Sequence, residues 1–544
     1  MLGLMQNGAI NLATILDHAA NWHGDQEIVT KRVEDGTIHR ETYKEARTRA
    51  RRLAYALDAL GVKSGDRIGT MAWNTWRHVE TWFALAGLGA VCHTLNPRLF
   101  PDQIDFIVND AEDSVLMIDL TFVPLIGPLL PRLPSVKSVI VLTDEAHMPD
   151  TSGFERDWHC YETLIANAQG EKDPIKLDDP NWASSLCYTS GTTGNPKGVL
   201  YGHMSNILHS MAAVQKDSMN LGSMDNVLMV VPMFHANSWG LTFALPMIGA
   251  KMVMPGPHMD GASILSLLND EKISFSGAVP TVWTGLLAHV QATGAKFDTL
   301  KEVVIGGSAV PRSMIEVFDK DYDINVLHAW GMTELSPLGT VNRKVGWHPE
   351  PADWSADIDR RVLQGRVPFG VEMKIVDDEG QTLPNDDEAF GRLLVKGPWV
   401  IERYYGKAET ALDDDGFFDT GDIASITPSG FMRITDRAKD VIKSGGEWIS
   451  SVDVENCAMG HSCVALAACI GITHPKWDER PLLLVTLAEG ASLDKDGINA
   501  HLASTFAKWQ IPDDIQVIET MPLTATGKVD KKPLRVDWAN HYTG

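Results

Sequence analysis

Hydrophobic positions in the first third of the chain alternate between helical and strand-like spacing. From residue 43 onward, apolar side chains recur every three or four residues, which predicts a helix that Gly61 ends. Short apolar runs bounded by polar residues and glycine predict strands between further helices. The predicted strands are Arg67–Trp73, Ala90–Leu95, Val115–Ile118 and Val139–Leu142, and the predicted helices are Trp76–Leu88 and Pro101–Asp110. Strands and helices that alternate in this way indicate parallel sheets covered by helices.

The pattern changes near residues 430–445. The residues that follow predict a helix at Val452–Met459, two apolar strands, a helix at Lys495–Phe506 and a final strand, which is enough for a small domain. A chain of 544 residues is also too long for one hydrophobic core. We therefore predict an α/β fold with a large N-terminal domain, residues 1–438, and a small C-terminal α+β domain, residues 439–544, whose boundary falls at Lys439.

Composition narrows the class of protein. Hydrophobic residues make up 44% and charged residues 22%, which is ordinary for a globular protein. The formal net charge of −24 argues against a nucleic-acid partner, because such a protein needs a basic face to meet phosphates. No uncharged apolar run reaches membrane-spanning length, the first residues do not resemble a secretory signal, and the six cysteines form no C-x-x-C pair. We expect a cytoplasmic protein without an integral membrane segment.

The most informative motif is the run Tyr188–Gly198, which follows a predicted strand at Ala183–Cys187. It combines three glycines, four aliphatic hydroxyls and one lysine, so its amides and hydroxyls can surround phosphate oxygens. Lys197 is followed by glycine rather than by the Ser or Thr that holds magnesium in a Walker loop. We predict a phosphate-binding loop of another kind, and a surface turn is the alternative.

This run resembles the phosphate loop of the adenylate-forming superfamily, which includes acyl-CoA synthetases, adenylation domains of peptide synthetases and beetle luciferases. Six further motifs resemble those of the superfamily and follow in the same order. They are Pro232–His235 (acid pocket), Gly306–Ser308 (adenine turn), Trp330–Glu334 (aromatic-Gly-x-Thr-Glu), Thr420–Asp422 (ribose), Asp436–Lys439 (hinge) and Pro522–Lys528 (catalytic lysine). The resemblance covers nearly the whole chain. It implies a ligase that uses ATP, Mg²⁺ and coenzyme A to activate a small carboxylic acid.

Several roles follow from the resemblance and also suit the residue types. Glu334 and Thr189 would hold magnesium, which takes hard oxygen ligands together with substrate phosphates, whereas helix capping is the alternative for Glu334 at a loop-to-helix junction. Asp422 would accept from the ribose hydroxyls, and we place it in a glycine-flanked turn, where a plain turn residue is the alternative. His235 would stand at the mouth of the acid pocket, or be a satisfied core histidine.

Lys528 has the most specific role. The substrate carboxylate and the α-phosphate are both anions, so an ammonium that bridges them opposes their repulsion in the first half-reaction. A solvated basic patch with Lys531 and Lys532 is the alternative. The resemblance further implies that the small domain is mobile and rotates about Lys439, which removes Lys528 before the thiol attacks.

The complete predicted site contains more residues than those discussed above. We predict catalytic roles for Lys528, Glu334, His235 and Lys439. The predicted ATP-binding residues are Thr189, Ser190, Gly191, Thr192, Thr193, Gly194, Lys197, Gly307, His328, Ala329, Trp330, Gly331, Thr333, Asp422, Arg437, Lys439 and Lys528. The predicted path of coenzyme A consists of Lys443, Ser444, Gly445, Gly446 and Trp448. The i,i+4 spacing of Lys439 and Lys443 leaves an ordinary helical surface as the alternative.

The predicted acyl pocket comprises His235, Trp239, Gly240, Val279, Gly306, Gly307 and Pro337. An indole at Trp239 would make this pocket short and blunt, although a core aromatic is the alternative. The run Lys443–Ser451 most resembles fatty-acyl-CoA synthetases and the group that ligates 3-methylmercaptopropionate. We therefore expect a short or medium acid such as 3-methylmercaptopropionate, with a medium- or long-chain fatty acid as the alternative.

Other functions stay open from the sequence. They are an adenylation module that feeds a carrier protein, a non-catalytic acyl- or nucleotide-binding relative, and luciferase-like oxidative decarboxylation. The presence of Lys528 counts against the non-catalytic relative, because binding alone would not need it. A homodimer is expected because fatty-acyl relatives often form one.

Overall fold

The computed structural model describes residues 4–6, 10–189, 195–347, 351–437, 440–444, 447–488, 490–524 and 529–542, with the backbone alone at 447 and 448. Contacts divide the chain into two compact units. Unit 1 consists of Met1–Val304, Gly331–Leu338 and Pro398–Ala411, and unit 2 of Ile305–Trp330, Gly339–Gly397 and Leu412–Gly544. Lys439 lies outside the described residues, and the domain boundary placed there stays a prediction.

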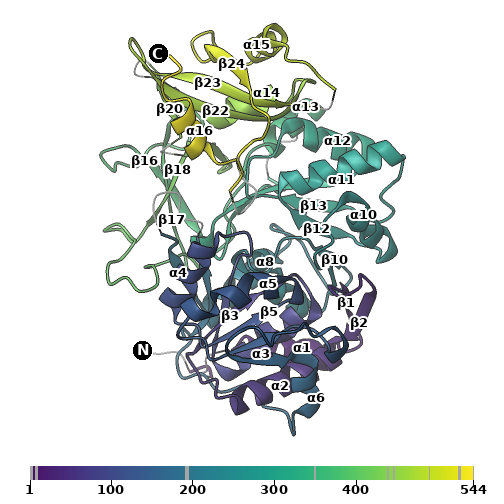
Figure 1. Cartoon of the computed structure of the whole chain (residues 1–544). Helices are drawn as coiled ribbons and strands as arrows, with labels where there is room; N and C mark the ends of the chain where they lie inside the picture. Colours follow the sequence, from purple (N-terminus) through teal and green to yellow (C-terminus); the bar gives the residue numbers. More distant parts are fainter. Residues whose placement is uncertain are drawn as a thin grey trace. The chain divides into compact units, whose positions relative to one another are not determined.

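Unit 1 is built on two sheets flanked by helices, as the alternating pattern predicts (Figure 1). The first sheet has the order β7 (Asp157–Cys160), β6 (Ser138–Val141), β5 (Val115–Ile118), β3 (Arg67–Met71), β4 (Val91–Thr94), β8 (Ala183–Tyr188) and β9 (Gly198–Gly202). All pairs in it are parallel except β8 with β9. The predicted parallel sheet is confirmed.

The second sheet of unit 1 has the order β13 (Glu302–Ile305), β12 (Phe275–Ala278), β10 (Asn226–Met229), β11 (Lys251–Met254), β1 (Glu27–Lys31) and β2 (Ile38–Thr42). The helices of unit 1 are α1 (Ala13–Trp22), α2 (Tyr43–Ala59), α3 (Trp76–Leu88), α4 (Pro101–Ala111), α5 (Val123–Ile126), α6 (Tyr161–Asn167), α7 (His203–Ala213), α8 (Ala236–Trp239), α9 (Leu241–Ile248), α10 (Gly261–Asp270) and α11 (Pro280–Thr293). Short 3₁₀ turns span Leu120–Phe122, Gly127–Arg132, Glu145–His147 and Thr333–Leu335.

The predicted helix at residue 43 shows how local chemistry sets these bounds. A capping box begins α2: the Thr42 hydroxyl accepts from the Glu45 N–H (3.3 Å), and the Glu45 carboxylate accepts from the Thr42 N–H (2.7 Å). The apolar positions that define the period are buried, and the helix packs on α3. Its other face carries arginines, one of which enters a buried ion network.

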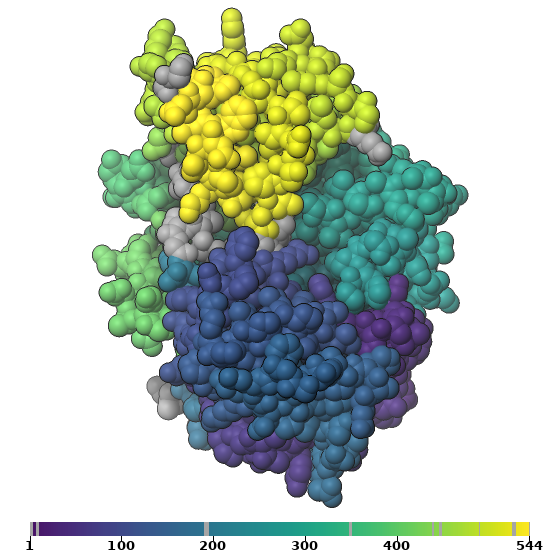
Figure 2. Space-filling view, in the orientation of Figure 1, coloured from purple at the N-terminus to yellow at the C-terminus, as the bar shows by residue number. Residues whose placement is uncertain are grey.

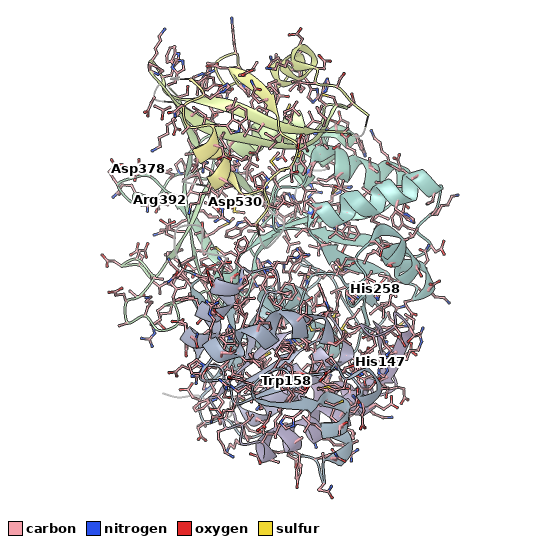
Figure 3. All side chains as sticks on the ribbon, viewed as in Figure 1. His147, Trp158, His258, Asp378, Arg392 and Asp530 are labelled. Carbon is pink, nitrogen blue, oxygen red and sulfur yellow. The ribbon has the colours of Figure 1, made fainter. Side chains whose placement is uncertain are left out.

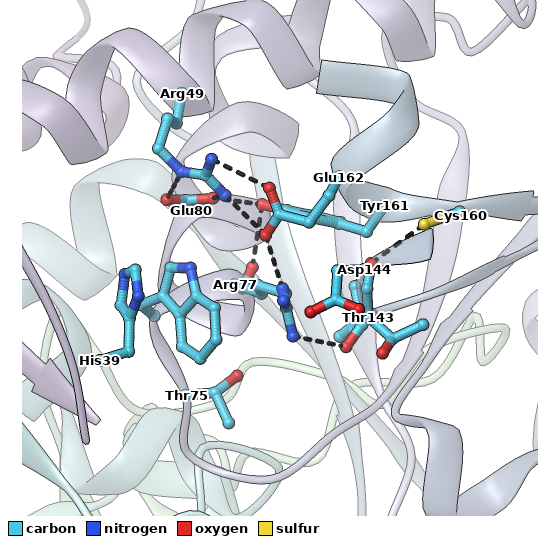
Figure 4. Close-up of polar contacts among 12 residues, drawn as sticks. His39, Arg49, Thr75, Arg77, Glu80, Thr143, Asp144, Cys160, Tyr161 and Glu162 are labelled. Carbon is cyan, nitrogen blue, oxygen red and sulfur yellow. Dashed lines mark hydrogen bonds and ion pairs between the residues drawn. The ribbon is translucent and has the colours of Figure 1, made fainter. Parts of the chain in front are cut away.

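That network joins α2, α3 and α6 in unit 1 (Figure 4). Arg49 binds Glu80 (Nε to Oε1, 2.6 Å), and Arg77 binds Glu162 (Nε to Oε1, 2.8 Å). Glu41 of β2 lies beside them, with its Oε2 3.6 Å from Nε of Arg49. Burial raises the pKa of Glu41 to about 7, so this carboxyl is neutral in the folded protein at mildly acidic pH.

Unit 2 contains the smaller sheets of the chain. An antiparallel sheet has the order β16 (Glu372–Val376), β17 (Phe390–Lys396), β18 (Phe418–Ile426) and β19 (Met432–Arg437). The C-terminal sheet has the order β21 (Glu447–Ile449), β20 (Ile442–Ser444), β23 (Asp478–Leu487) and β22 (Val464–His474), with β24 (Asp514–Val517) paired to β23. The remaining elements are α12 (Arg312–Tyr322), β14 (Asn325–Gly331), β15 (Leu338–Val341), α13 (Trp354–Arg361), α14 (Ser451–Ala458), α15 (Lys495–Ala503) and α16 (Lys531–Asp537).

The C-terminal part is α+β, as predicted, and its last residues gather into one yellow patch in Figure 2. Helix α14 packs on β22, and apolar side chains of both elements form a core with α15. Within the described ranges of the chain, no helix is long and apolar enough to cross a membrane.

Candidate active site

The predicted phosphate loop begins and ends on a hairpin of unit 1. Strands β8 and β9 pair in antiparallel fashion, with Tyr188 opposite Gly198, and the Thr189 N–H donates to the Lys197 carbonyl (2.9 Å). The hairpin therefore brings the two ends of the loop together. Its predicted phosphate ligands Ser190, Gly191, Thr192, Thr193 and Gly194 lie outside the described residues.

Glu334 lies on the 3₁₀ turn Thr333–Leu335, which is three residues long, and is 8% exposed. The Tyr404 hydroxyl donates to its Oε1 (2.9 Å), and the Ile401 N–H donates to its backbone carbonyl (2.8 Å). The Tyr201 hydroxyl holds the neighbouring Thr333 carbonyl (2.7 Å). The Tyr404 bond orients the carboxylate, and the other two hold the backbone of the turn that carries it.

Tyr404 also connects this carboxylate to Lys197 of the predicted phosphate loop. Nζ of Lys197 lies 4.7 Å from the centroid of the Tyr404 ring, within cation–π range. Burial raises the pKa of the Tyr404 hydroxyl, and the nearby Glu334 carboxylate raises it further, so the hydroxyl stays a donor. The sequence reasoning missed Tyr404, because nothing in its neighbourhood marks it as a partner of a residue seventy positions away.

The acid-pocket motif leads into an unusual backbone. Ala236, Asn237, Ser238 and Trp239 have φ of 43°, 59°, 56° and 55°, and Gly240 follows at 82°. Residues 236–240, called the left-handed turn below, thus contain four consecutive non-glycine residues in the left-handed region. Each such residue costs roughly 1–2 kcal/mol. Strain of this kind persists only where the surrounding structure imposes it, and it concentrates at functional sites.

The left-handed turn contains or adjoins three predicted pocket residues of unit 1, His235, Trp239 and Gly240. His235, half-buried, precedes it. Trp239 is 7% exposed and its indole lies over β12, where a Cβ added to Gly277 would be 3.6 Å from Cζ3 of Trp239. Val279 precedes α11, and Pro337 is buried after a cis peptide bond with Ser336.

His209 of α7 fixes the end of the same turn. A Cβ at Gly240 would meet Cε1 of His209 at 2.5 Å, so this position requires glycine for space as well as for its φ. Burial lowers the pKa of His209 to about 3, and its neutral Nε2 accepts from the Leu338 N–H (3.1 Å). The imidazole therefore connects the left-handed turn to the segment that carries Glu334.

Two of the predicted nucleotide residues of unit 2, Trp330 and Arg437, contact Asp422. The Trp330 indole N–H donates to its Oδ2 (2.9 Å), and Nε of Arg437 binds its Oδ1 (2.7 Å). Asp422 is 1% exposed, and its ionised carboxylate can only accept hydrogen bonds. His328, from the same strand as Trp330, donates from Nδ1 to the Val362 carbonyl (2.9 Å), and burial lowers its pKa to about 4.

The predicted turn at Asp422 is wrong. Residues 418–426 form one strand, β18, and the register against β17 shifts between Arg392 and Leu394. Gly421 has φ of 70°, which allows a bulge inside the strand rather than a chain reversal. Arg392, labelled in Figure 3, binds Asp419 (Nη1 to Oδ2, 2.8 Å) beside this bulge. The bulge aims Asp422 at Trp330.

The remaining predicted residues lie on separate elements, and the contacts of the described residues do not bring them together in one site. Gly306 and Gly307 follow β13, and Gly307 has φ of 84°; Ala329 and Gly331 flank Trp330 on β14. Lys443 and Ser444 lie on β20, so the alternative of a helical surface for Lys443 is wrong. The Ser444 hydroxyl accepts from Arg480 (3.0 Å), and the Lys443 N–H donates to Glu479 (3.0 Å). Lys439, Gly445, Gly446, Lys528 and the side chain of Trp448 lie outside the described residues.

Comparison with known proteins identifies the family. The model of the AMP-binding enzyme family matches residues 16–405, and that of the AMP-binding enzyme C-terminal domain matches residues 453–528. The chain is 45% identical to the 3-methylmercaptopropionyl-CoA ligase of Ruegeria lacuscaerulensis, over all of both chains. It is 46% identical to the medium-chain-fatty-acid–CoA ligase of Ectopseudomonas oleovorans, over 98% of this chain and 97% of that one.

Solved structures share the fold. The crystal structure of an anthranilate CoA ligase in complex with anthranoyl-AMP superposes with a TM-score of 0.84, at 23% identity, over 98% of both chains. The predictions of an α/β fold with a small C-terminal α+β domain, and of membership in the adenylate-forming superfamily, are confirmed.

Proposed function

The chain belongs to the AMP-binding enzyme family and is an AMP-forming acid–CoA ligase, and we propose that its acid is short, of the size of 3-methylmercaptopropionate. In such a ligase the substrate carboxylate attacks the α-phosphate of ATP and pyrophosphate leaves. The thiol of coenzyme A then attacks the acyl carbonyl and AMP leaves. The similarity to acid–CoA ligases is explained without the two other activities, adenylation for a carrier protein and light emission.

The nucleotide roles rest on geometry within each unit. Asp422, held by Trp330 and Arg437, would accept from the ribose hydroxyls, because these two contacts orient its acceptor-only carboxylate. Glu334 and Thr189 would hold Mg²⁺, and the oriented, acceptor-only carboxylate of Glu334 fits that ion. The ion would neutralise charge on the phosphates.

The chemistry of the first step is assigned to Lys528. We propose that its ammonium bridges the attacking carboxylate and the α-phosphate, and that Lys439 is the pivot about which the small domain moves between the half-reactions. Lys443, Ser444, Gly445, Gly446 and Trp448 would then line the path of coenzyme A. A cytoplasmic location and a homodimer belong to the same proposal.

The preference for a short acid rests on Trp239. Its indole is buried over Gly277, and the left-handed turn fixes its backbone on both sides. A large, rigid ring held in this way would end the acyl pocket after a few carbons. The full-length identity to a 3-methylmercaptopropionyl-CoA ligase supports the same conclusion.

A medium- or long-chain fatty acid is the second candidate. The chain is as similar to a medium-chain-fatty-acid–CoA ligase as to the short-acid ligase, and 42% identical to the long-chain-fatty-acid–CoA ligase of Thermus thermophilus. Under this alternative Trp239 would be a ring that swings aside.

The test is kcat/KM against acid chain length for the wild type and Trp239→Ala, with Trp239→Phe as the conservative control. Each buried methylene contributes about 0.8 kcal/mol, or roughly fourfold, so an open tunnel gives a steady climb with chain length. We expect a plateau or fall after a few carbons in the wild type, a shift to longer acids in Trp239→Ala, and a smaller shift in Trp239→Phe. A wild type that climbs through long fatty acids would establish the second candidate instead.

A further inference from the structure

The left-handed turn has a sequence poorly suited to its backbone. Glycine adopts a positive φ readily and asparagine tolerates it, but Ala236, Ser238 and Trp239 do not. The turn is completely enclosed: Asn237 and Ser238 are 1% and 0% exposed, so solvent cannot stabilise its polar groups. Contacts from neighbouring elements must therefore hold this conformation.

Asn206 of α7 supplies the most specific of these contacts. Its Oδ1 accepts from Nδ2 of Asn237 (3.1 Å), and its own Nδ2 donates to the hydroxyls of Ser184 (3.0 Å) and Ser185 (3.3 Å) on β8. Asn206 is 1% exposed and uses both ends of its amide. It thereby ties the left-handed turn to the strand that leads into the phosphate loop.

Further bonds hold the two ends of the turn. The Ser238 hydroxyl donates to the Val231 carbonyl (2.7 Å), and the Thr242 hydroxyl donates to the Asn237 carbonyl (3.1 Å). His209, one helical turn after Asn206, fills the space beside Gly240. One face of α7 thus supports the turn at its middle and at its end.

We propose that Asn206 is a positioning residue for acid selectivity, and that its bond to Asn237 holds the left-handed turn in the form that keeps the Trp239 indole over Gly277. The proposal rests on the proposed placement of the acid against Trp239. Asn206 bonds Asn237 and acts on Trp239 through the backbone of the turn. When the bond is lost, the turn relaxes toward ordinary φ values and the indole moves.

A matched pair of substitutions at Asn237 distinguishes the effect of backbone strain in the left-handed turn from the effect of losing the hydrogen bond to Asn206. Asn237→Ala and Asn237→Gly both remove the amide that Asn206 binds, but only glycine keeps the left-handed backbone without strain. Asn206→Ala removes the acceptor of the same bond. The double variant Asn206→Ala/Asn237→Gly also lacks the bond, but its glycine at position 237 adopts the left-handed backbone without strain, so the bond is no longer needed. Ser210→Ala is the control on α7, because its hydroxyl donates to the Asn206 carbonyl within the helix (2.7 Å) and has no other hydrogen bond among the residues that the structure describes.

The measurement is the ratio of kcat/KM for the wild type's best acid to that for the acid two methylenes longer or shorter, whichever is next best. We expect Asn237→Ala and Asn206→Ala to change this ratio about tenfold, which corresponds to about 1.4 kcal/mol, with the KM for ATP within about twofold. Asn237→Gly, the double variant and Ser210→Ala should keep the ratio within about twofold of the wild type. Melting temperatures identify any variant that does not fold. If Asn206→Ala does not fold, the comparison of Asn237→Ala with Asn237→Gly still tests the proposal.

Two results would overturn the proposal. In one, Asn237→Ala and Asn237→Gly change the ratio equally or not at all. In the other, Asn206→Ala and Asn237→Ala lower kcat/KM by the same factor for every acid, which is the result expected of a purely structural residue. A wild type that prefers long acids rejects the short-acid function, yet a difference between the two Asn237 variants in that protein still supports the role of Asn206.

Discussion

Replacing Tyr404 with phenylalanine isolates the contact that orients the Glu334 carboxylate. The substitution removes the donor to Oε1 (2.9 Å) but keeps the ring that faces Nζ of Lys197. A hydrogen bond to a charged group contributes about 1.5–3 kcal/mol, and water cannot replace it easily at a carboxylate that is 8% exposed. Groups that orient a metal ligand change metal affinity by about 10–100-fold when removed.

We therefore expect Tyr404→Phe to raise the Mg²⁺ concentration for half-maximal ATP–pyrophosphate exchange by about tenfold or more. The titration is run at saturating acid, and a calorimetric melt confirms that the variant is folded. Tyr405→Phe is the matched control, because the Tyr405 hydroxyl has no hydrogen bond within the described residues. Its backbone N–H donates to the Gly198 carbonyl (2.8 Å) and its ring packs on an apolar cluster, and the substitution keeps both contacts. An unchanged Mg²⁺ titration in folded Tyr404→Phe would refute the assignment of Glu334 to the metal.

Three further predictions address other parts of the molecule. Trp330→Phe removes the donor to Asp422 and should raise the KM for ATP about tenfold with little change in kcat; an unchanged KM would contradict a ribose role for this carboxylate. Glu41 is protonated in the folded state and ionised in the unfolded state between pH 4.5 and about 7, so its contribution to stability falls as pH rises through that range. Glu41→Gln should therefore gain up to about 3 kcal/mol relative to the wild type in urea unfolding at pH 8 but little at pH 4.5, and an equal difference at both pH values would contradict this. Lys528→Ala should nearly abolish adenylation yet leave thiolation of supplied acyl-AMP intact, and equal damage to both half-reactions would argue against its assignment.

Local patterns predicted several regular elements well. The period of α2 reflects burial of one face, whereas α3 and β5 are buried on all sides. The predicted bounds of α3 and β5 agree with the structure at both ends, and α2 begins at the predicted residue. Asp422 was placed in a turn because glycine beside a polar residue is typical of turns. In the folded chain the antiparallel ladder continues through Gly421 as a bulge, and only the neighbouring strand determines that outcome.

The candidate site was predictable where its chemistry lies in one short motif. Glu334, Trp330 and Asp422 belong to such motifs, and the structure brings Trp330 and Asp422 together. Tyr404 and Asn206 were missed because each acts on a distant residue and neither has a local signal beyond its type. The left-handed turn was also beyond sequence reasoning, since Ala-Asn-Ser-Trp favours no left-handed backbone and tertiary contacts impose it.

The direct test of the central claim is a single-turnover experiment with the full-length protein, excess ATP and Mg²⁺, and radiolabelled 3-methylmercaptopropionate. Without coenzyme A, we expect pyrophosphate and enzyme-bound acyl-AMP to form in equal amounts. Coenzyme A added afterwards should convert that acyl-AMP to acyl-CoA and release AMP. Formation of ADP and phosphate, or acyl-CoA formation without a preceding acyl-AMP, would contradict the account.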